Sequence, residues 1–348
     1  MANQMPALVK PDASPGVILD LASKPVCGLD DVLIRVLKTG ICGTDAHIYA
    51  WNEWARKRVR PPLIIGHEFM GVVEGVGEAV ENFKPGDMVS GEGHIACGRC
   101  YFCRTGQGHI CRNLKIIGVD RNGCFARYLT LPHTNVWKVK PGIPEAVAAI
   151  LDPLGNAMHT VMAQPVAGKT VAILGAGAIG LMASKIAKAA GALWVVMVEP
   201  QARKRDLALS CGAQASFDPS EPGWEQQLLQ RTPEAAGVDV VLELSGSVAG
   251  TRSAFGLVRP GGEIALLGIP PAEVSLNFAE AIIFKAVTVR GISGRLMFET
   301  WYQCERFLLD GKLDLLPLIT HCFPYRDYID AFAVLERGEA VKVILDWE

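Results

Sequence analysis

The sequence predicts an α/β protein of two domains, in which a β-rich domain precedes a doubly wound domain with a parallel sheet. The chain has 348 residues, and a single hydrophobic core rarely grows beyond about 250–300 residues. Residues 1 to about 150 contain short apolar runs between glycine and proline turns, a pattern typical of strands and loops. From Gly168 onward, apolar runs of strand length alternate with helical stretches, as in βαβ units.

The individual elements follow from these runs. In the first domain, strands are predicted at 32–36 and 71–76, and Pro85-Gly86 marks a later turn. In the second domain, strands are predicted at 170–174, 193–198, 238–242, 263–267 and 286–290, and helices at 178–190, 202–211 and 248–258. A helix at 297–309 and a strand at 341–345 come last. This last segment is too short to fold alone, so we expect 296–348 to join 1–153 in the first domain, with 154–295 forming the second.

Charge and hydropathy argue against two classes of partner. The chain has 34 Lys and Arg, 36 Asp and Glu and a net charge of −2, so it lacks the basic excess of nucleic-acid-binding proteins. No apolar run reaches the roughly 18 residues of a membrane span, and the first residues lack the basic start and apolar stretch of a signal peptide. We therefore expect a cytoplasmic protein that acts on a small molecule, without nucleic-acid or membrane partners.

A glycine-rich turn in the second domain predicts a dinucleotide site. Gly175-Ala176-Gly177-Ala178-Ile179-Gly180 follows the predicted strand at 170–174 and opens the next helix. In this context Gly175 permits a tight turn, Gly177 lets the backbone approach a pyrophosphate, and Gly180 allows close packing of helix and strand. The helix N-terminus adds amide donors and a favourable dipole.

Glu199 follows the next predicted strand and bears on the choice of dinucleotide. A carboxylate at this place accepts hydrogen bonds from the adenosine ribose and repels a 2′-phosphate, which favours NAD over NADP. The basic pair Arg203 and Lys204 is the counterargument, although a solvated first helical turn also explains it.

Four of the ten cysteines crowd into fifteen residues and predict a structural zinc site. Cys97, Cys100, Cys103 and Cys111 offer four soft ligands in a lobe at about 92–114, and structural zinc requires four such ligands in a closed tetrahedron. In a reducing compartment such a cluster binds metal rather than forming disulfides. An iron–sulfur cluster also uses four cysteines, but the final Cys-Pro spacing of bacterial ferredoxins is absent from the sequence.

A second, dispersed group predicts an open metal site. Cys42 lies in the segment 40–47 (Gly-Ile-Cys-Gly-Thr-Asp-Ala-His), and His67 and Glu68 follow Gly66. Soft, borderline and hard ligands from separate loops suit a catalytic zinc that keeps one position for water or a substrate oxygen. Each residue alone has an ordinary structural explanation, so the prediction depends on their joint occurrence beside the dinucleotide motif.

Taken in this order, the motifs resemble those of the zinc-dependent medium-chain alcohol dehydrogenase family over the whole chain. The resemblance implies a GroES-like catalytic domain, a Rossmann NAD-binding domain and two zinc ions per subunit, one catalytic and one structural. Segments 51–54, 91–94, 152–160 and 294–302 resemble the branch of the family that oxidises L-threonine. That branch implies oxidation of L-threonine to L-2-amino-3-oxobutanoate with hydride transfer to NAD, a homotetramer, and a metabolic link to a 2-amino-3-oxobutanoate CoA ligase.

The resemblance also assigns roles around the catalytic zinc. It implies zinc on Cys42, His67 and a carboxylate, for which Glu68 and Asp152 compete. The resemblance further implies a proton relay and a group that orients a zinc-bound imidazole. In the relay, the hydroxyl of Thr44 passes the substrate proton through the cofactor ribose to the imidazole of His47. Asp45 matches the group that orients the zinc-bound imidazole.

Coenzyme contacts carried over from the family extend beyond the three glycines of the turn. The matching positions are Ile179, Glu199, Lys204, Leu267, Gly268, Ile269, Ile292 and Ser293.

Three alternatives stay open at this point. A polyol or 2,3-butanediol dehydrogenase would share the same zinc and coenzyme machinery. A zinc-finger binding module would explain the cysteine lobe together with the basic residues 56–60, but it conflicts with the near-neutral charge. A zinc-free reductase of the same family would not need Cys42, His67 and the four-cysteine lobe together.

Overall fold

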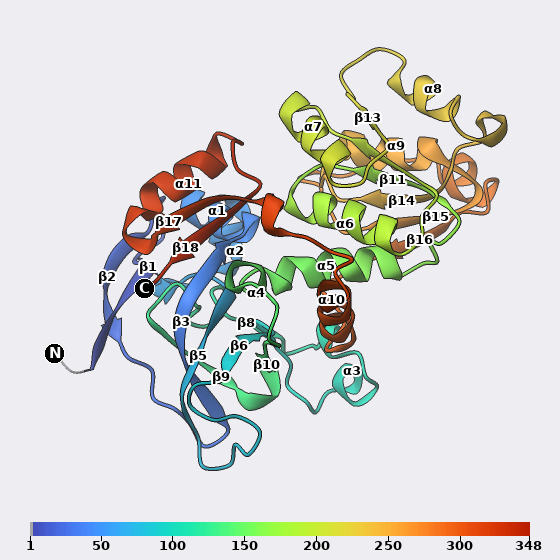
Figure 1. Cartoon of the computed structure of the whole chain (residues 1–348). Helices are drawn as coiled ribbons and strands as arrows, with labels where there is room; N and C mark the ends of the chain where they lie inside the picture. The colour runs from blue at the N-terminus through green and yellow to red at the C-terminus, as the bar shows by residue number, and fades with distance from the viewer. Residues whose placement is uncertain (1–2) are drawn as a thin grey trace. The chain divides into compact units, whose positions relative to one another are not determined.

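A computed structural model describes residues 3–348, and the chain divides into two compact units (Figure 1). Unit 1 is Met1–Asp152 with Asp314–Glu348, and unit 2 is Pro153–Leu313. This division differs from the predicted one, which placed 296–313 in the first domain. These residues continue from the last strand of unit 2, and Leu296 and Thr300 line a cavity together with Met162 from the first helix of that unit.

Unit 1 is mainly β-structure. Its elements are β1 (Gln4–Lys10), β2 (Ile18–Ser23), β3 (Asp31–Ile41), α1 (Gly43–Ala50), α2 (Glu53–Arg58), β4 (Leu63–Ile64), β5 (Glu68–Val76), β6 (Met88–Gly91), β7 (His94–Ile95), α3 (Tyr101–Arg104), η1 (Gly108–Ile110), β8 (Lys115–Ile116), β9 (Tyr128–Pro132), η2 (His133–Asn135), β10 (Val136–Lys138), α4 (Glu145–Ala148), η5 (Leu316–Leu318), β17 (Ile319–Pro324), η6 (Tyr325–Asp327), α11 (Tyr328–Glu336) and β18 (Lys342–Asp346). The main sheet runs β10-β6-β5-β3-β18-β17, with β9 also paired to β3. The chain end thus returns to unit 1, where β18 pairs antiparallel with β3.

Unit 2 is the doubly wound part. Its elements are α5 (Leu151–Met162), which begins at the unit boundary, β11 (Thr170–Leu174), α6 (Ala178–Ala189), β12 (Trp194–Val198), α7 (Ala202–Ser210), β13 (Ala215–Phe217), α8 (Trp224–Leu229), η3 (Pro233–Ala235), β14 (Val238–Glu243), α9 (Val248–Leu257), β15 (Val258–Leu266), η4 (Ala279–Ile283), β16 (Thr288–Gly291) and α10 (Glu299–Leu309). The sheet runs β13-β12-β11-β14-β15-β16 with every pairing parallel. This is the strand order of dinucleotide-binding folds, and the predicted α/β class is confirmed.

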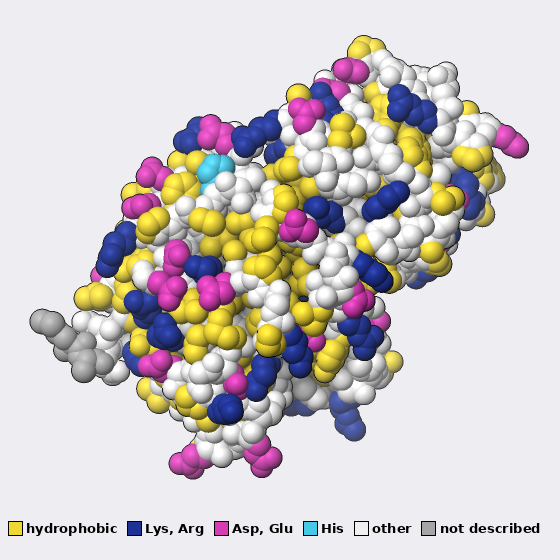
Figure 2. Space-filling model, viewed as in Figure 1, with side chains coloured by type: hydrophobic (Ala, Val, Ile, Leu, Met, Phe, Trp, Pro, Cys, Tyr) yellow, Lys and Arg dark blue, Asp and Glu magenta, His cyan; other side chains and the backbone are white. Residues whose placement is uncertain are grey.

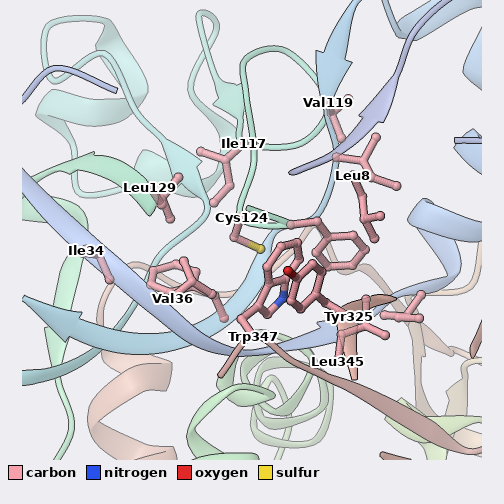
Figure 3. Close-up of a cluster of buried hydrophobic side chains, with 14 of the residues drawn as sticks. Leu8, Ile34, Val36, Ile117, Val119, Cys124, Leu129, Tyr325, Leu345 and Trp347 are labelled. Carbon is pink, nitrogen blue, oxygen red and sulfur yellow. The ribbon is translucent and has the colours of Figure 1, made fainter. Parts of the chain in front are cut away.

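The core of unit 1 gathers apolar side chains from both ends of the chain (Figure 3). Trp347 is fully buried and stacks on Tyr325, with ring centroids 4.6 Å apart. Its Nε1–H donates to Thr39 Oγ1 at 2.9 Å, which satisfies the indole donor inside the core. Leu8 and Ile34 from the N-terminal part lie in the same cluster. The last strand therefore belongs to the same core as the first.

On the face shown in Figure 2, acidic and basic side chains are interspersed. Within residues 3–348, no helix is long and apolar enough to cross a membrane.

Candidate zinc and coenzyme sites

The dispersed metal group forms where two paired strands of unit 1 meet. β3 ends at Ile41, directly before Cys42, and β5 begins at Glu68, directly after His67. The register of the two strands places Gly40 opposite Glu68. Pairing thus brings the segments together, and ligand atoms of Cys42, His67 and Glu68 lie within 4.8 Å of one another.

Negative charge is concentrated around His67, which is buried. Burial lowers the pKa of its imidazole, but the nearby charges of Asp45, Cys42 and Asp152 outweigh burial and raise the pKa to about 10. Asp45 Oδ1 lies 3.8 Å from His67 Nδ1, and Asp45 Oδ2 accepts a hydrogen bond from the Cys42 amide at 2.9 Å. A buried group rich in negative charge fits a divalent cation, which would neutralise that charge.

Glu68 has a partner that the sequence analysis missed. Lys342 Nζ lies 2.6 Å from Glu68 Oε1 and 2.5 Å from Oε2, and both side chains are buried. The same ammonium donates to the Ile41 carbonyl at 3.0 Å. The carboxylate raises the pKa of Lys342 against the effect of burial. A Cβ at Gly40 would lie 2.2 Å from Glu68 Oε2, so a larger residue there would displace this carboxylate.

Asp152, the competing carboxylate, lies at the start of α5 and is buried. It falls outside the group of ligand atoms that are close to one another. Its charge is still near enough to contribute to the raised pKa of His67. In this conformation Glu68 belongs to the group of close ligand atoms and Asp152 does not, while Lys342 binds both oxygens of Glu68.

The four clustered cysteines form a compact lobe, whose base is the antiparallel pair β7–β8. Cys100 Sγ lies 3.5 Å from Cys103 Sγ and 3.8 Å from Cys111 Sγ. A tetrahedron with zinc–sulfur distances of about 2.3 Å has sulfur–sulfur edges of about 3.8 Å, so the spacing fits zinc. Hydrogen bonds from the backbone of Arg99 and from Asn113 lower the pKa of Cys97 to about 6, whereas burial and the neighbouring thiols raise that of Cys103 to about 12. Such crowded thiols need a cation before all four can lose their protons.

The two predicted relay residues lie on α1. Thr44 and His47 are three residues apart, which places them on one face of the helix. Thr44 is half-buried and His47 is exposed. His47 Nδ1 lies 3.0 Å from the side-chain nitrogen of Asn52.

The basic side chains of segment 56–60 form hydrogen bonds and ion pairs within the chain. Arg58 binds both oxygens of Asp120, and Asp120 also accepts from the Ile116 amide at 2.9 Å. Arg56 Nε donates to the Trp51 carbonyl, and Lys57 pairs with a glutamate of the same helix. Arg60 donates to two neighbouring carbonyls. These contacts give the basic residues of segment 56–60 partners within the chain.

The glycine turn joins β11 to α6 in unit 2. Gly175 has φ +98°, a conformation that favours glycine, and a Cβ on Gly180 would lie 1.9 Å from the Gly175 carbonyl oxygen. Space beside Gly177 is open, and no side chain caps the N-terminus of α6. The exposed amides of this helix N-terminus can therefore bind a phosphate.

Glu199 connects the turn to the end of β12. Its Oε2 accepts from the Ala176 amide at 2.9 Å, and its Oε1 accepts from the Gln201 amide at 3.0 Å. A cavity of about 440 Å³ within unit 2 is lined by Gly175, Gly177, Glu199 and Lys204 together. The open turn and this cavity fit a dinucleotide.

The remaining coenzyme positions follow the carboxyl ends of neighbouring strands, where ligands bind in open α/β sheets. Leu267 and Gly268 donate their amides to the Glu243 carbonyl at 3.0 and 3.1 Å. Ile269 is 85% exposed, and the Ile292 amide donates to the Leu266 carbonyl. Ser293 is exposed and Ile179 is half-buried in the first turn of α6.

Two family models match this chain. Residues 28–141 match the alcohol dehydrogenase GroES-like domain, and residues 178–310 match the zinc-binding dehydrogenase domain. The chain is 46% identical to the L-threonine 3-dehydrogenase of Solibacter usitatus, covering 99% of this chain and 100% of that protein. It is also 46% identical to the L-threonine 3-dehydrogenase of Pyrococcus abyssi, covering 99% of each chain.

Two solved dehydrogenase structures have the same fold over nearly the whole chain. Galactitol-1-phosphate dehydrogenase from Escherichia coli matches with a TM-score of 0.90 at 29% identity, covering 98% of this chain and 100% of that one. The 2R,3R-butanediol dehydrogenase from Bacillus subtilis matches with a TM-score of 0.88 at 26% identity, covering 99% and 100%. Both domain types and the full-length relatives confirm the predicted resemblance, and the chain belongs to the zinc-dependent medium-chain dehydrogenase family.

Proposed function

We propose that this chain is an NAD-dependent L-threonine 3-dehydrogenase that converts L-threonine to L-2-amino-3-oxobutanoate with the help of zinc. The observation that carries the proposal is full-length identity of 46% to proteins with that activity in their names. The buried Cys42–His67–Glu68 group supports the zinc chemistry, and the cavity at the glycine turn supports the dinucleotide.

In the proposed catalytic centre, Cys42, His67 and Glu68 hold zinc, and Asp152 is the alternative carboxylate. Cys97, Cys100, Cys103 and Cys111 hold the structural zinc. When bound, zinc supplies a Lewis acid for the alcohol oxygen and NAD supplies the hydride acceptor.

The chain's own residues handle the proton. The Thr44 hydroxyl both accepts and donates, so it can take the proton of the substrate hydroxyl and pass it on. His47 is exposed on the same face of α1 and can release the proton to water. Asp45 stabilises the orientation of the His67 ring, since its Oδ1 lies 3.8 Å from His67 Nδ1.

The proposed coenzyme is NAD rather than NADP. The Glu199 carboxylate lines the cavity and would repel a 2′-phosphate, while Lys204 lines the same cavity and is the opposing charge. The remaining proposed contacts are those of the glycine turn and of the positions after β15 and β16.

The experiment for this proposal is a Cys42→Ala variant, compared with the parent for L-threonine oxidation, zinc content and NAD binding. We expect turnover to be lost together with one zinc per subunit, while NAD binding, measured by fluorescence titration, is kept. Full turnover in the variant would overturn the metal assignment. A 2,3-butanediol or polyol dehydrogenase is the second candidate, favoured by the structural match to the butanediol enzyme, and a substrate panel separates the two.

We also propose a homotetramer in which β16 strands of two copies pair. β16 is the edge strand of the unit 2 sheet, and all four of its residues are exposed. Light scattering after gel filtration should give four subunits, and Val289→Lys on β16 should reduce that number. The link to a CoA ligase and the cytoplasmic location stay predictions.

A further inference from the structure

The side chain of Asn52 lies next to the imidazole of His47, and the orientation of its amide group can be determined from its contacts. Asn52 is the N-cap of α2, and its Oδ1 accepts a hydrogen bond from the Ala55 amide at 3.0 Å. An asparagine amide has one oxygen and one NH2 group. Since the oxygen faces Ala55, the group that lies 3.0 Å from His47 Nδ1 is the NH2 group, which only donates.

The protonation of the ring follows from this geometry. A nitrogen that receives a hydrogen bond from an NH2 group must offer a lone pair, so Nδ1 of His47 carries no proton. The proton of the neutral ring is then on Nε2. We propose that Asn52 is a positioning residue that sets the tautomer and orientation of His47, an inference that rests on the proposed role of His47 in proton release.

Several contacts hold Asn52 in place for this role. Its amide N–H donates to the His47 carbonyl at 3.3 Å, so backbone and side chain bind the same residue. The preceding Trp51 adopts a left-handed conformation (φ 52°) and is 5% exposed. Lys10 Nζ lies 4.7 Å from the centre of the Trp51 ring, and Arg56 Nε donates to the Trp51 carbonyl at 3.0 Å. The turn after α1 is thus fixed from several sides.

This arrangement makes Nδ1 the nitrogen at which His47 exchanges a proton, because Nε2 already carries one in the neutral ring. A proton that arrives at Nδ1 displaces the Asn52 donor, because a ring with protons on both nitrogens cannot accept that hydrogen bond. Loss of this proton from Nδ1 to water, which reaches the exposed ring, restores the hydrogen bond. Asn52 therefore favours release of the proton and return of the ring to its resting tautomer.

Three substitutions separate this role from simple helix capping. Asn52→Ser and Asn52→Asp keep an oxygen that caps α2. Serine is too short to reach His47, and aspartate can only accept, so it favours a proton on Nδ1. Asn52→Ala removes both the cap and the donor.

The readouts are steady-state kinetics and nitrogen NMR of ¹⁵N-histidine-labelled protein, with the His47 signal identified by its loss in His47→Gln. We expect the Nε2–H tautomer in the parent and the Nδ1–H tautomer in Asn52→Asp. We expect kcat to fall about three- to tenfold in Asn52→Ser and Asn52→Asp, the range for one lost hydrogen bond, with KM for both substrates and Tm unchanged.

Two results would overturn the inference. The first is an Nδ1–H tautomer in the parent. The second is a kcat that equals the parent's in Asn52→Ser and Asn52→Asp and falls only in Asn52→Ala, because that pattern is expected of a residue that only caps the helix. Because the spectra report the tautomer without turnover, absence of L-threonine oxidation in the parent would count against the proposed function and not against the tautomer.

Discussion

Replacing Lys342 by methionine tests the buried ion pair next to the proposed catalytic zinc. Lys342 is 3% exposed and Glu68 is fully buried, and the ammonium lies within 2.6 Å of the carboxylate. Methionine fills similar space but donates no hydrogen bond, so the Glu68 carboxylate stays buried without its cation. Losing one partner of a buried pair costs about 3–5 kcal/mol. At about 2–4 °C per kcal/mol for a folding unit of about 150–250 residues, the size range of unit 1, we expect the Tm of unit 1 to fall by about 6–20 °C.

Differential scanning calorimetry of zinc-loaded and chelated protein measures this effect. A cation on Glu68 replaces part of the lost charge, so the drop in Tm should be larger after chelation. The double variant Lys342→Met with Glu68→Gln removes both charges and should recover most of the loss. An unchanged Tm in the single variant, or a double variant no more stable than the single one, would refute the reasoning.

Three further predictions concern the structural lobe, the coenzyme and the core. Cys100→Ser should lose one zinc per subunit by metal analysis and lower Tm, while the control Cys211→Ser, a buried cysteine outside both groups, should keep both ions. Glu199→Ala should raise KM for NAD about tenfold or more and weaken discrimination against NADP, because a charged hydrogen-bond acceptor contributes about 1.5–3 kcal/mol; unchanged preference would remove Glu199 from the site. Trp347→Ala should cost about 3–5 kcal/mol in urea unfolding, since it empties a fully buried indole site; a loss below about 1 kcal/mol would contradict the packing described.

Features set by neighbouring residues could be predicted from the sequence. The strand at 170–174 and the helix that begins at Ala178 are present where the apolar runs and the glycine turn indicate them. The four cysteines lie within one loop, so their spacing alone predicts their proximity. Shorter elements were missed: β13 has only three residues, too few for a pattern to emerge.

Features that depend on distant pairing could not be predicted. Lys342 reaches Glu68 only because β18 pairs with β3, and no local pattern marks a lysine at the start of a mostly apolar strand as the partner of that carboxylate. Asn52 belongs to a segment that the sequence singled out by resemblance alone. Its link to His47 depends on the left-handed turn at Trp51, which a non-glycine residue seldom adopts.

The most direct measurement is the initial rate of NADH formation by zinc-loaded protein with L-threonine, compared with D-threonine, 2,3-butanediol and sorbitol, each with NAD and with NADP. We expect selective oxidation of L-threonine with NAD, and loss of that rate in Cys42→Ala. A preference for diols would contradict the proposed substrate, and an equal rate in Cys42→Ala would contradict the proposed zinc site.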